Sequence, residues 1–286
     1  MDCGDLHALP LGTLQSVTTV FLSHGHIDHW IGLDALVRAQ LFCAQTLRIV
    51  GPEGLLELLQ SRLQGYAWNL IGDSPFVVEG YEWREGRWQG TRFPCCRAFR
   101  AGEELQGLPD LGGWDLRWVQ LQHGVPCLGY RLQHPAQFRF LGADCPHRPG
   151  PWIEQAKQSR RLGLPDQVIE LGQVALPAAQ TWRWLEALPE LSLAYITDTR
   201  LDSTTRERIV NAFGPTQVLW CEAAFLEHQQ HLAEAKLHAT AREAARLALE
   251  LPCQELRLFH LSRRTQGQVD EHLQEARQLF APTFAG

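Results

Sequence analysis

The stretch Ser23-His24-Gly25-His26-Ile27-Asp28-His29 places three histidines and an aspartate within six consecutive positions. It follows an apolar, β-branched run over 17–22, which predicts a strand that ends in a tight loop. Imidazole and carboxylate groups are the ligands that suit a borderline divalent cation such as zinc. Four ligands are too many for one open catalytic ion, so the spacing predicts two adjacent ions. A histidine tag or storage tract lacks both this strand and the helix-like sequel over 30–41.

Composition narrows the classes of protein that this chain can be. It has 286 residues, of which 45% are hydrophobic, and its formal net charge of −6 argues against a polybasic protein that wraps nucleic acid. A metal centre can still attract an anionic substrate. No apolar run approaches ~18 residues and no secretory signal is recognisable, so we expect no membrane partner. Eight scattered cysteines without a CxxC pair predict reduced thiols and a cytoplasmic location.

Short β-rich runs alternate with longer helical stretches, which predicts an α/β fold with sheets covered by helices. We expect strands at 17–23, 47–50, 76–83, 115–122, 127–132, 137–142, 193–197, 216–221 and 255–260. We expect helices at 30–42, 53–64, 151–161, 178–187, 203–213, 229–236, 241–250 and 268–279. The clearest helix start is Thr240-Ala-Arg-Glu243, which has the spacing of a capping box. A single domain over 1–286 is expected, because candidate ligands are spread from residue 24 to residue 260.

Three further strands end on residues that can bind metal. His123 follows an alternating strand and precedes a glycine, Asp198 ends the run 193–197, and His260 ends the run 255–260. Alone, His123 would more often be a satisfied half-buried histidine, and a strand-end aspartate is usually a cap or turn residue. Three such strand ends at one edge of a sheet are harder to dismiss. With the first cluster they supply five histidines and two aspartates, enough for two metals with open positions.

Two other residues are candidates for proton transfer. His238 precedes the capped helix, where the helix dipole disfavours the imidazolium and makes it a stronger proton donor. It could equally be a plain surface residue. Glu222, in Cys221-Glu-Ala-Ala-Phe-Leu, could orient that imidazole.

The ordered motifs SHGHIDH, HGVPCLGYRL, YITDTR, CEAAFL with LHATAREAARLA, and FHLSRR resemble those of tRNase Z (ribonuclease Z). Members of that family are metallo-β-lactamase-fold endonucleases that trim the 3′ end of precursor tRNA. HxHxDH alone marks the broad superfamily, whereas the later motifs are more particular to this branch. The resemblance runs from Asp2-Cys3-Gly4 to about Arg264. It implies a metallo-β-lactamase αββα sandwich, classed as α/β (α+β in some schemes).

The resemblance also implies a role for each candidate. The metal ligands fall into two groups, His24, His26 and His123 for one ion and Asp28, His29 and His260 for the other, with Asp198 bridging both. His238 matches the proton-transfer histidine and Glu222 an acidic position, so the expected catalytic set is His238, Asp28 and Glu222. Two Zn²⁺ ions, or Mn²⁺ in their place, would lower the pKa of a bridging water and present hydroxide to the phosphodiester. The expected products carry a 3′-hydroxyl on the tRNA and a 5′-phosphate on the trailer.

The sequence departs from the family in two places. The family has some tens of residues before its Asp-Cys-Gly segment, so either the recorded start is too late or the fold lacks the first N-terminal strands. In the second case one sheet edge would be unpaired. Bacterial members carry an arm that grips the tRNA elbow. A reduced, arm-like excursion is expected near 145–176. At the expected base of this arm, only Lys157, Arg160 and Arg161 are basic. Family members commonly form homodimers in which one subunit's arm serves the other's cleft.

Three functions therefore stay open from sequence alone. The leading interpretation is a dinuclear zinc phosphodiesterase that processes the 3′ end of precursor tRNA. The second keeps the site and changes the substrate to a small phosphodiester, lactone or thioester, which the weak arm and acidic balance favour. The third is a non-catalytic or truncated relative, against which the intact ligand set argues.

Overall fold

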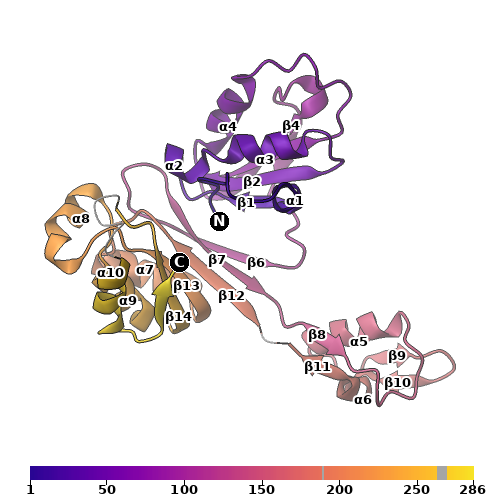
Figure 1. The fold of residues 1–286 in the computed structure, drawn as a ribbon. Coiled ribbons are helices and arrows are strands. Elements are labelled where there is room, and N and C mark those ends of the chain that lie inside the picture. Colours follow the sequence, from indigo (N-terminus) through magenta and orange to yellow (C-terminus); the bar gives the residue numbers. More distant parts are fainter. Residues whose placement is uncertain (189, 263–268) are drawn as a thin grey trace. The chain divides into compact units, whose positions relative to one another are not determined.

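The computed structural model describes residues 1–188, 190–262 and 269–286 (Figure 1). The chain forms two compact units. The larger unit comprises 1–110, 117–131 and 193–286, and the smaller comprises 111–116 and 132–192. The predicted single domain stays a prediction; its expected excursion near 145–176 lies within the smaller unit. Residue 268, the first of the last predicted helix, and Arg263 and Arg264 of FHLSRR lie outside the described residues.

The first sheet of the larger unit has five strands in chain order. They are β1 (Thr19–Phe21), β2 (Thr46–Pro52), β3 (Val77–Arg84), β4 (Arg87–Pro94) and β5 (Glu104–Gln106). β1, β2 and β3 are parallel, and β4 and β5 continue antiparallel. Helices α3 (Leu33–Gln40) and α4 (Leu55–Gln64) bury one face, with Leu33 and Leu36 of α3 and Leu59 of α4, in the core of this sheet. The short α1 (Leu11–Ser16) has no buried residue. A short 3₁₀ helix, η1 (Cys95–Arg97), follows β4.

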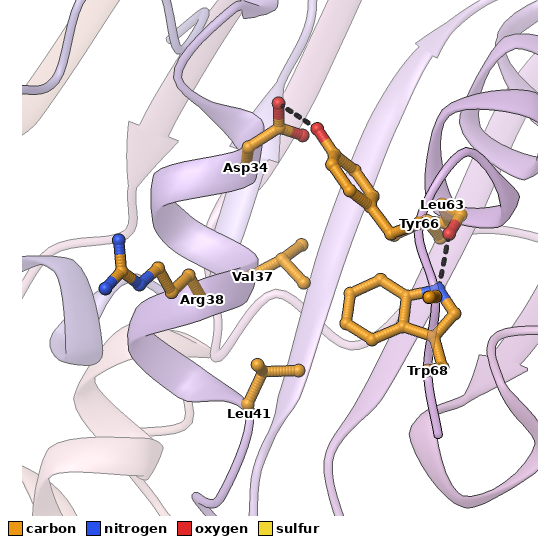
Figure 2. Close-up of a pocket in the computed structure, with 8 residues that line it drawn as sticks. Asp34, Val37, Arg38, Leu41, Leu63, Tyr66 and Trp68 are labelled. Atoms are coloured by element: carbon orange, nitrogen blue, oxygen red, sulfur yellow. Dashed lines mark hydrogen bonds between the residues drawn. The ribbon is translucent and has the colours of Figure 1, made fainter. Parts of the chain in front are cut away.

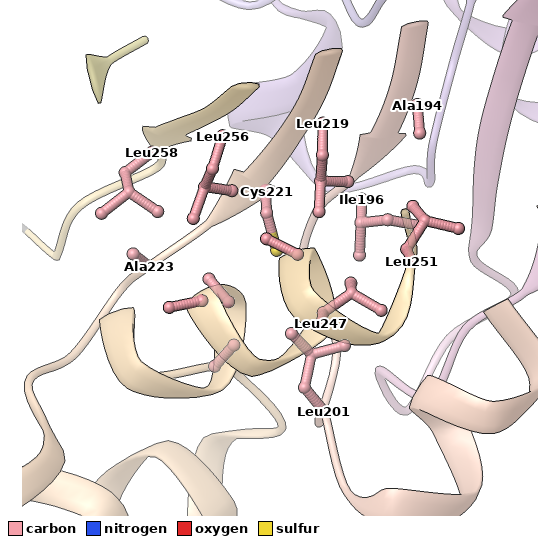
Figure 3. Packing of buried hydrophobic residues seen from close by; sticks show 14 of the residues in the cluster. Ala194, Ile196, Leu201, Leu219, Cys221, Ala223, Leu247, Leu251, Leu256 and Leu258 are labelled. Atoms are coloured by element: carbon pink, nitrogen blue, oxygen red, sulfur yellow. The ribbon is translucent and has the colours of Figure 1, made fainter. Parts of the chain in front are cut away.

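The second sheet of the larger unit has the order β15-β14-β13-β12-β7-β6. Its strands are β6 (Asp115–Gln120), β7 (Leu128–His134), β12 (Leu191–Ile196), β13 (Thr216–Glu222), β14 (Cys253–Phe259) and β15 (Thr283–Ala285). β12 to β15 run parallel. They are covered by α7 (Ser203–Phe213), α9 (Ala241–Glu250) and α10 (Val269–Arg277). Figure 3 shows Leu219, Cys221 and Leu256 of the strands pointing toward Leu247 and Leu251 at α9.

The smaller unit has its own core. Helix α5 (Trp152–Arg161), α6 (Ala178–Thr181) and the 3₁₀ helix η2 (Trp182–Trp184) pack with two antiparallel strand pairs. These are β8 (Phe138–Phe140) with β11 (Leu185–Ala187), and the hairpin of β9 (Val168–Glu170) and β10 (Ala175–Pro177). Phe138, Trp152 and Trp184 are buried among them. The predicted helix 178–187 is therefore wrong over 185–187, which form an edge strand.

Two other differences from the expected elements have local causes. The predicted helix 30–42 is split into α2 (Ile27–Trp30) and α3, because the Gly32 amide donates to the Cys3 carbonyl at 2.8 Å and any side chain at Gly32 would collide with that segment. The unpredicted β4 is joined to β3 by the two-residue turn Glu85–Gly86, both with positive φ, as a type I′ hairpin requires. None of the described helices is long and apolar enough to span a bilayer.

The capping box at the start of α9 is confirmed. The Thr240 side chain accepts from the Glu243 amide, and the Glu243 carboxylate accepts from the Thr240 amide at 2.9 Å. Two backbone donors at a buried helix start are thereby satisfied. The helix that covers the second sheet, and that follows His238, depends on this contact.

We predict that Thr240→Ala lowers the free energy of unfolding by about 1 kcal/mol, the usual effect of losing an N-cap. Urea denaturation followed by circular dichroism measures it. Thr204→Ala, at an exposed position inside α7, is the matched control and should change stability little. Equal effects of the two substitutions would contradict the capping role.

Candidate functional site

The candidate residues of the second sheet lie where neighbouring parallel strands end. Asp198 comes two residues after β12, Glu222 is the last residue of β13, and His260 directly follows β14. The three strands are paired in register, so their carboxyl ends meet at one edge. Asp198 and His260 adopt left-handed backbone conformations, with φ of 38° and 55°. Such strain at non-glycine residues clusters at functional sites, where the surrounding structure enforces it.

The first group of donors is formed by the buried His24, His123 and Asp198 and the exposed His26. His26 Nδ1 lies 2.9 Å from His24 Nε2 and 3.3 Å from His123 Nε2. Asp198 Oδ2 lies 3.6 Å from His24 Nε2 and 3.4 Å from His123 Nε2. One atom of each residue lies within 4.8 Å of the others. The loop after β1, the loop after β6 and the end of β12 thus meet at one point.

The second group is formed by Asp28, His29 and His260. Asp28 Oδ2 lies 3.8 Å from His29 Nε2 and 3.6 Å from His260 Nε2. Asp198 borders this group as well, because its Oδ2 lies 3.4 Å from His29 Nε2 and its Oδ1 lies 3.1 Å from His260 Nδ1. The structure thus brings all seven predicted ligands together, with Asp198 between the two groups.

His238 and Glu222 form a contact beside these groups. Glu222 is fully buried, and its Oε2 lies 2.8 Å from His238 Nδ1 while its Oε1 accepts from the Thr199 amide at 2.6 Å. Burial raises the pKa of Glu222 well above its usual range and lowers the pKa of His238. A protonated Glu222 donates to Nδ1, which leaves hydrogen on Nε2; a protonated His238 also carries hydrogen there. The contact at Nδ1 fixes the ring of His238 and leaves its Nε2 free of Glu222.

Asp2 was given no role from sequence, although it opens the Asp-Cys-Gly segment. Its carboxylate accepts from the Ser23 amide at 2.7 Å, the Ser23 hydroxyl at 2.8 Å and the Tyr195 hydroxyl at 3.0 Å. His29 Nδ1 lies 2.7 Å from the same carboxylate. A carboxylate that receives Nδ1–H fixes the ring orientation and leaves Nε2 free to bind a metal. Tyr195, on β12, ties this network to the second sheet.

A backbone carbonyl orients another histidine. His123 Nδ1 lies 3.2 Å from the carbonyl oxygen of Leu237, which ends α8 (Gln230–Lys236) in a left-handed conformation with φ of 57°. His238 follows directly. The residue that positions His123 is therefore joined by one peptide bond to the candidate proton donor, a relation that the motifs do not reveal.

The charge states of the buried groups follow from their surroundings. Burial, together with the charge of His29, lowers the pKa of His24 to about 2. Burial also acts to lower the pKa of His29, but the nearby carboxylates of Asp198 and Asp2 outweigh it and raise that pKa to about 10. Burial opposes ionisation of Asp198, yet the histidines around it hold its pKa below the usual range. Without a cation, His24 is therefore neutral, whereas His29 is protonated beside the ionised Asp198. A cation bound at His29 Nε2 would take the place of that proton.

The donor set fits a metal ion. His29 Nε2 and His260 Nδ1 are buried atoms without a hydrogen bond among the described residues. Buried polar atoms are normally satisfied, so both are available to a ligand that completes the site. Imidazole nitrogens converging with carboxylate oxygens, and oriented from behind by Asp2 and Leu237, are typical of such centres.

Comparisons with known proteins agree with this arrangement. The family model described as "Beta-lactamase superfamily domain" matches residues 5–170. A ribonuclease Z from Deinococcus radiodurans is 32% identical, over 100% of this chain and 89% of the relative. The metallo-beta-lactamase fold protein YhfI from Bacillus subtilis has a TM-score of 0.56 and 18% identity, covering 99% of this chain and 81% of that one. The short form of human tRNase Z has a TM-score of 0.52 and 16% identity, covering 92% and 82%. The last two likenesses concern the fold.

The fold and the histidine–aspartate cluster define a metal-dependent hydrolase of the β-lactamase superfamily. The resemblance seen in the motifs, and the fold that it implied, are confirmed. Within that superfamily, the chain belongs to the ribonuclease Z family.

We predict that Tyr195→Phe lowers the free energy of unfolding by about 1 kcal/mol, because a buried carboxylate loses one donor while the ring keeps its stack on Phe259. Urea denaturation of the metal-free protein measures it. The control is Tyr66→Phe, whose hydroxyl donates to Asp34 at an exposed position and should cost less. A stability unchanged by Tyr195→Phe would exclude the tyrosine from the Asp2 network.

Proposed function

We propose that the protein is a zinc-dependent endoribonuclease that removes the 3′ trailer of precursor tRNA and holds two zinc ions. The convergence of seven ligand-type residues, with Asp198 between the two groups, carries the proposal. The name of the Deinococcus relative supports the ribonuclease activity, and the eight free cysteines support a cytoplasmic location. Mn²⁺ is the alternative metal, since the donors are nitrogen and oxygen.

The residues of the site have three proposed roles, of which metal binding is the first. His24, His26 and His123 would hold one ion and Asp28, His29 and His260 the other, with Asp198 shared. Zinc in such a site supplies Lewis acidity and makes water a nucleophile near neutral pH.

Proton transfer is the second role. His238, as the imidazolium, would donate its Nε2 proton to the ribose oxygen that leaves and become neutral imidazole, while Glu222 holds the ring through Nδ1. Positioning is the third, and it belongs to Asp2 and the Leu237 carbonyl, which hold the rings of His29 and His123 from behind.

One observation favours a smaller substrate. The three basic residues expected at the base of the arm are engaged within the smaller unit. Lys157 pairs with Glu154 at 2.6 Å, and Arg160 donates to the carbonyls of Trp182 and Leu185. Arg161 donates to the Ala136 carbonyl at 3.2 Å. A metallo-hydrolase of small phosphodiesters is therefore the second candidate function. If the substrate is RNA, another surface must supply the RNA contacts, and we propose that it does so in a homodimer.

We predict close to two zinc ions per chain in purified protein, measured by plasma mass spectrometry. His24→Ala should lower the content, because its Nε2 belongs to the first donor group. His228→Ala, at an exposed position outside the donor groups, should leave it unchanged. Folded protein that binds no divalent metal at all would refute the proposed centre.

We predict cleavage of a precursor tRNA after its discriminator base, abolished by a chelator. His238→Ala should slow the reaction about 10²–10⁴-fold, the range of general acid contributions, with zinc content unchanged. His231→Ala, an exposed histidine on α8, is the control. Hydrolysis of bis(p-nitrophenyl) phosphate without any cut in a precursor would favour the second function. Loss of zinc in His238→Ala would mean that the residue binds metal.

A further inference from the structure

Two adjacent cavities lie in the larger unit, away from the metal-ligand groups, and Trp68 lines both. The first, of about 390 Å³, is lined by Val37, Leu41 and Leu63 together with Tyr66 and polar residues at its rim. Figure 2 shows the rings of Tyr66 and Trp68 facing Val37 and Leu41 across it. Its one carboxylate, on Asp34, is already engaged by Arg62 at 2.9 Å and by the Tyr66 hydroxyl at 2.7 Å. The cavity is thus an aromatic-walled, largely apolar slot.

The second cavity, of about 540 Å³, has the opposite character. Arg97 and Arg100 line it together with Cys96, Ile71 and Trp68, and no acidic residue is among the described residues that line it. Both arginines are exposed, and neither has an ion pair or hydrogen-bonded side chain within 1–188, 190–262 and 269–286. The nearby carboxylate of Glu103 is paired with Arg92 at 3.0 Å. Two uncompensated guanidinium groups at one concave site favour an anion.

The backbone between the two arginines is strained. Ala98 and Phe99 are consecutive residues with positive φ, 54° and 53°, which is costly for a bulky side chain. Phe99 is fully buried, with its ring 4.8 Å from Trp68 and 6.1 Å from Phe76, and this packing enforces the conformation. The turn brings Arg97 and Arg100 to the same cavity. Strain maintained by the core at an exposed basic turn is typical of ligand-binding loops.

The apolar cavity and the arginine-lined cavity together indicate which class of ligand fits. Cavities of about 300–1,000 Å³ suit small ligands, and an apolar aromatic slot beside an anion site requires a flat apolar group carrying a negative charge. A base stacked on an aromatic ring, with its phosphate on arginine, meets both demands. The same chemistry occurs in a free nucleotide and in a single-stranded RNA.

We propose that the two cavities form one site for a nucleoside monophosphate unit, with the base against Trp68 and Tyr66 and the phosphate on Arg97 and Arg100. The assignment of that unit to a single-stranded part of the RNA substrate rests on the proposed function; the site itself does not. Asp34, through its bonds with Arg62 and Tyr66, positions the wall of the slot.

The test measures binding to the purified full-length protein. Fluorescein-labelled octa-adenylate is titrated by anisotropy at several salt concentrations, with a gel to show that the strand stays intact, and adenosine 5′-monophosphate is titrated by calorimetry. Arg97→Ala and Arg100→Ala should each weaken binding about tenfold. Each should also reduce the salt dependence of strand binding by about 0.7 in the log–log slope. Arg87→Ala, which removes an exposed arginine from the start of β4, is the control for net charge and should have little effect.

Trp68→Leu removes the stacking surface and should weaken binding by about tenfold or more; denaturation shows whether it folds. If the arginine variants lose binding of both probes, the result supports a site for the free nucleotide. If they lose binding of octa-adenylate alone, it supports a contact with RNA. Arginine variants that bind both probes as the Arg87→Ala control does overturn the proposal. Cleavage of precursor tRNA is scored separately, so cleavage with unchanged binding refutes only this site, and nucleotide binding without cleavage refutes only the proposed function.

Discussion

The buried carboxylate of Asp198 is the group on which the arrangement of the larger unit depends. It is 3% exposed, and its two oxygens face His24, His29, His123 and His260. An isolated carboxylate in such a place would be strongly unfavourable, so the donors around it are a condition of folding as well as of function. They come from the loop after β1, the loop after β6 and the end of β14. The two sheets are thereby held together at their functional edge.

Aromatic residues between the two sheets also hold them together, at a second place. Trp83 and Trp88 of the β3–β4 hairpin contact Trp118 of β6, with ring centroids 4.8 and 5.0 Å apart. Phe21 of β1 contacts Tyr130 of β7, whose hydroxyl donates to the Leu22 carbonyl at 2.7 Å. These contacts fix the end of β1, and so the start of the histidine loop, against the sheet that supplies Asp198.

Sequence could identify the seven candidate ligands that the structure brings together, because they are chemistry-bearing residue types at or just after the ends of apolar runs. Thr240 and Glu243 were predictable for a similar reason, since a capping box is local. The β3–β4 hairpin was missed because Glu85 is an unusual first residue for its turn, and β11 was missed because an edge strand formed by pairing with β8 leaves a weak local pattern. Asp2, Tyr195 and the Leu237 carbonyl could not be recognised. They act through contacts between distant segments, and a carbonyl is common to every residue.

The position of Leu237 has a consequence for how the centre can fail. Its carbonyl supports His123, its side chain packs near Gly124, and its peptide bond leads into His238. Under the proposed roles, the last turn of α8 would therefore serve ion binding at His123 and proton donation by His238 together. Fraying of that turn would disturb both residues at once.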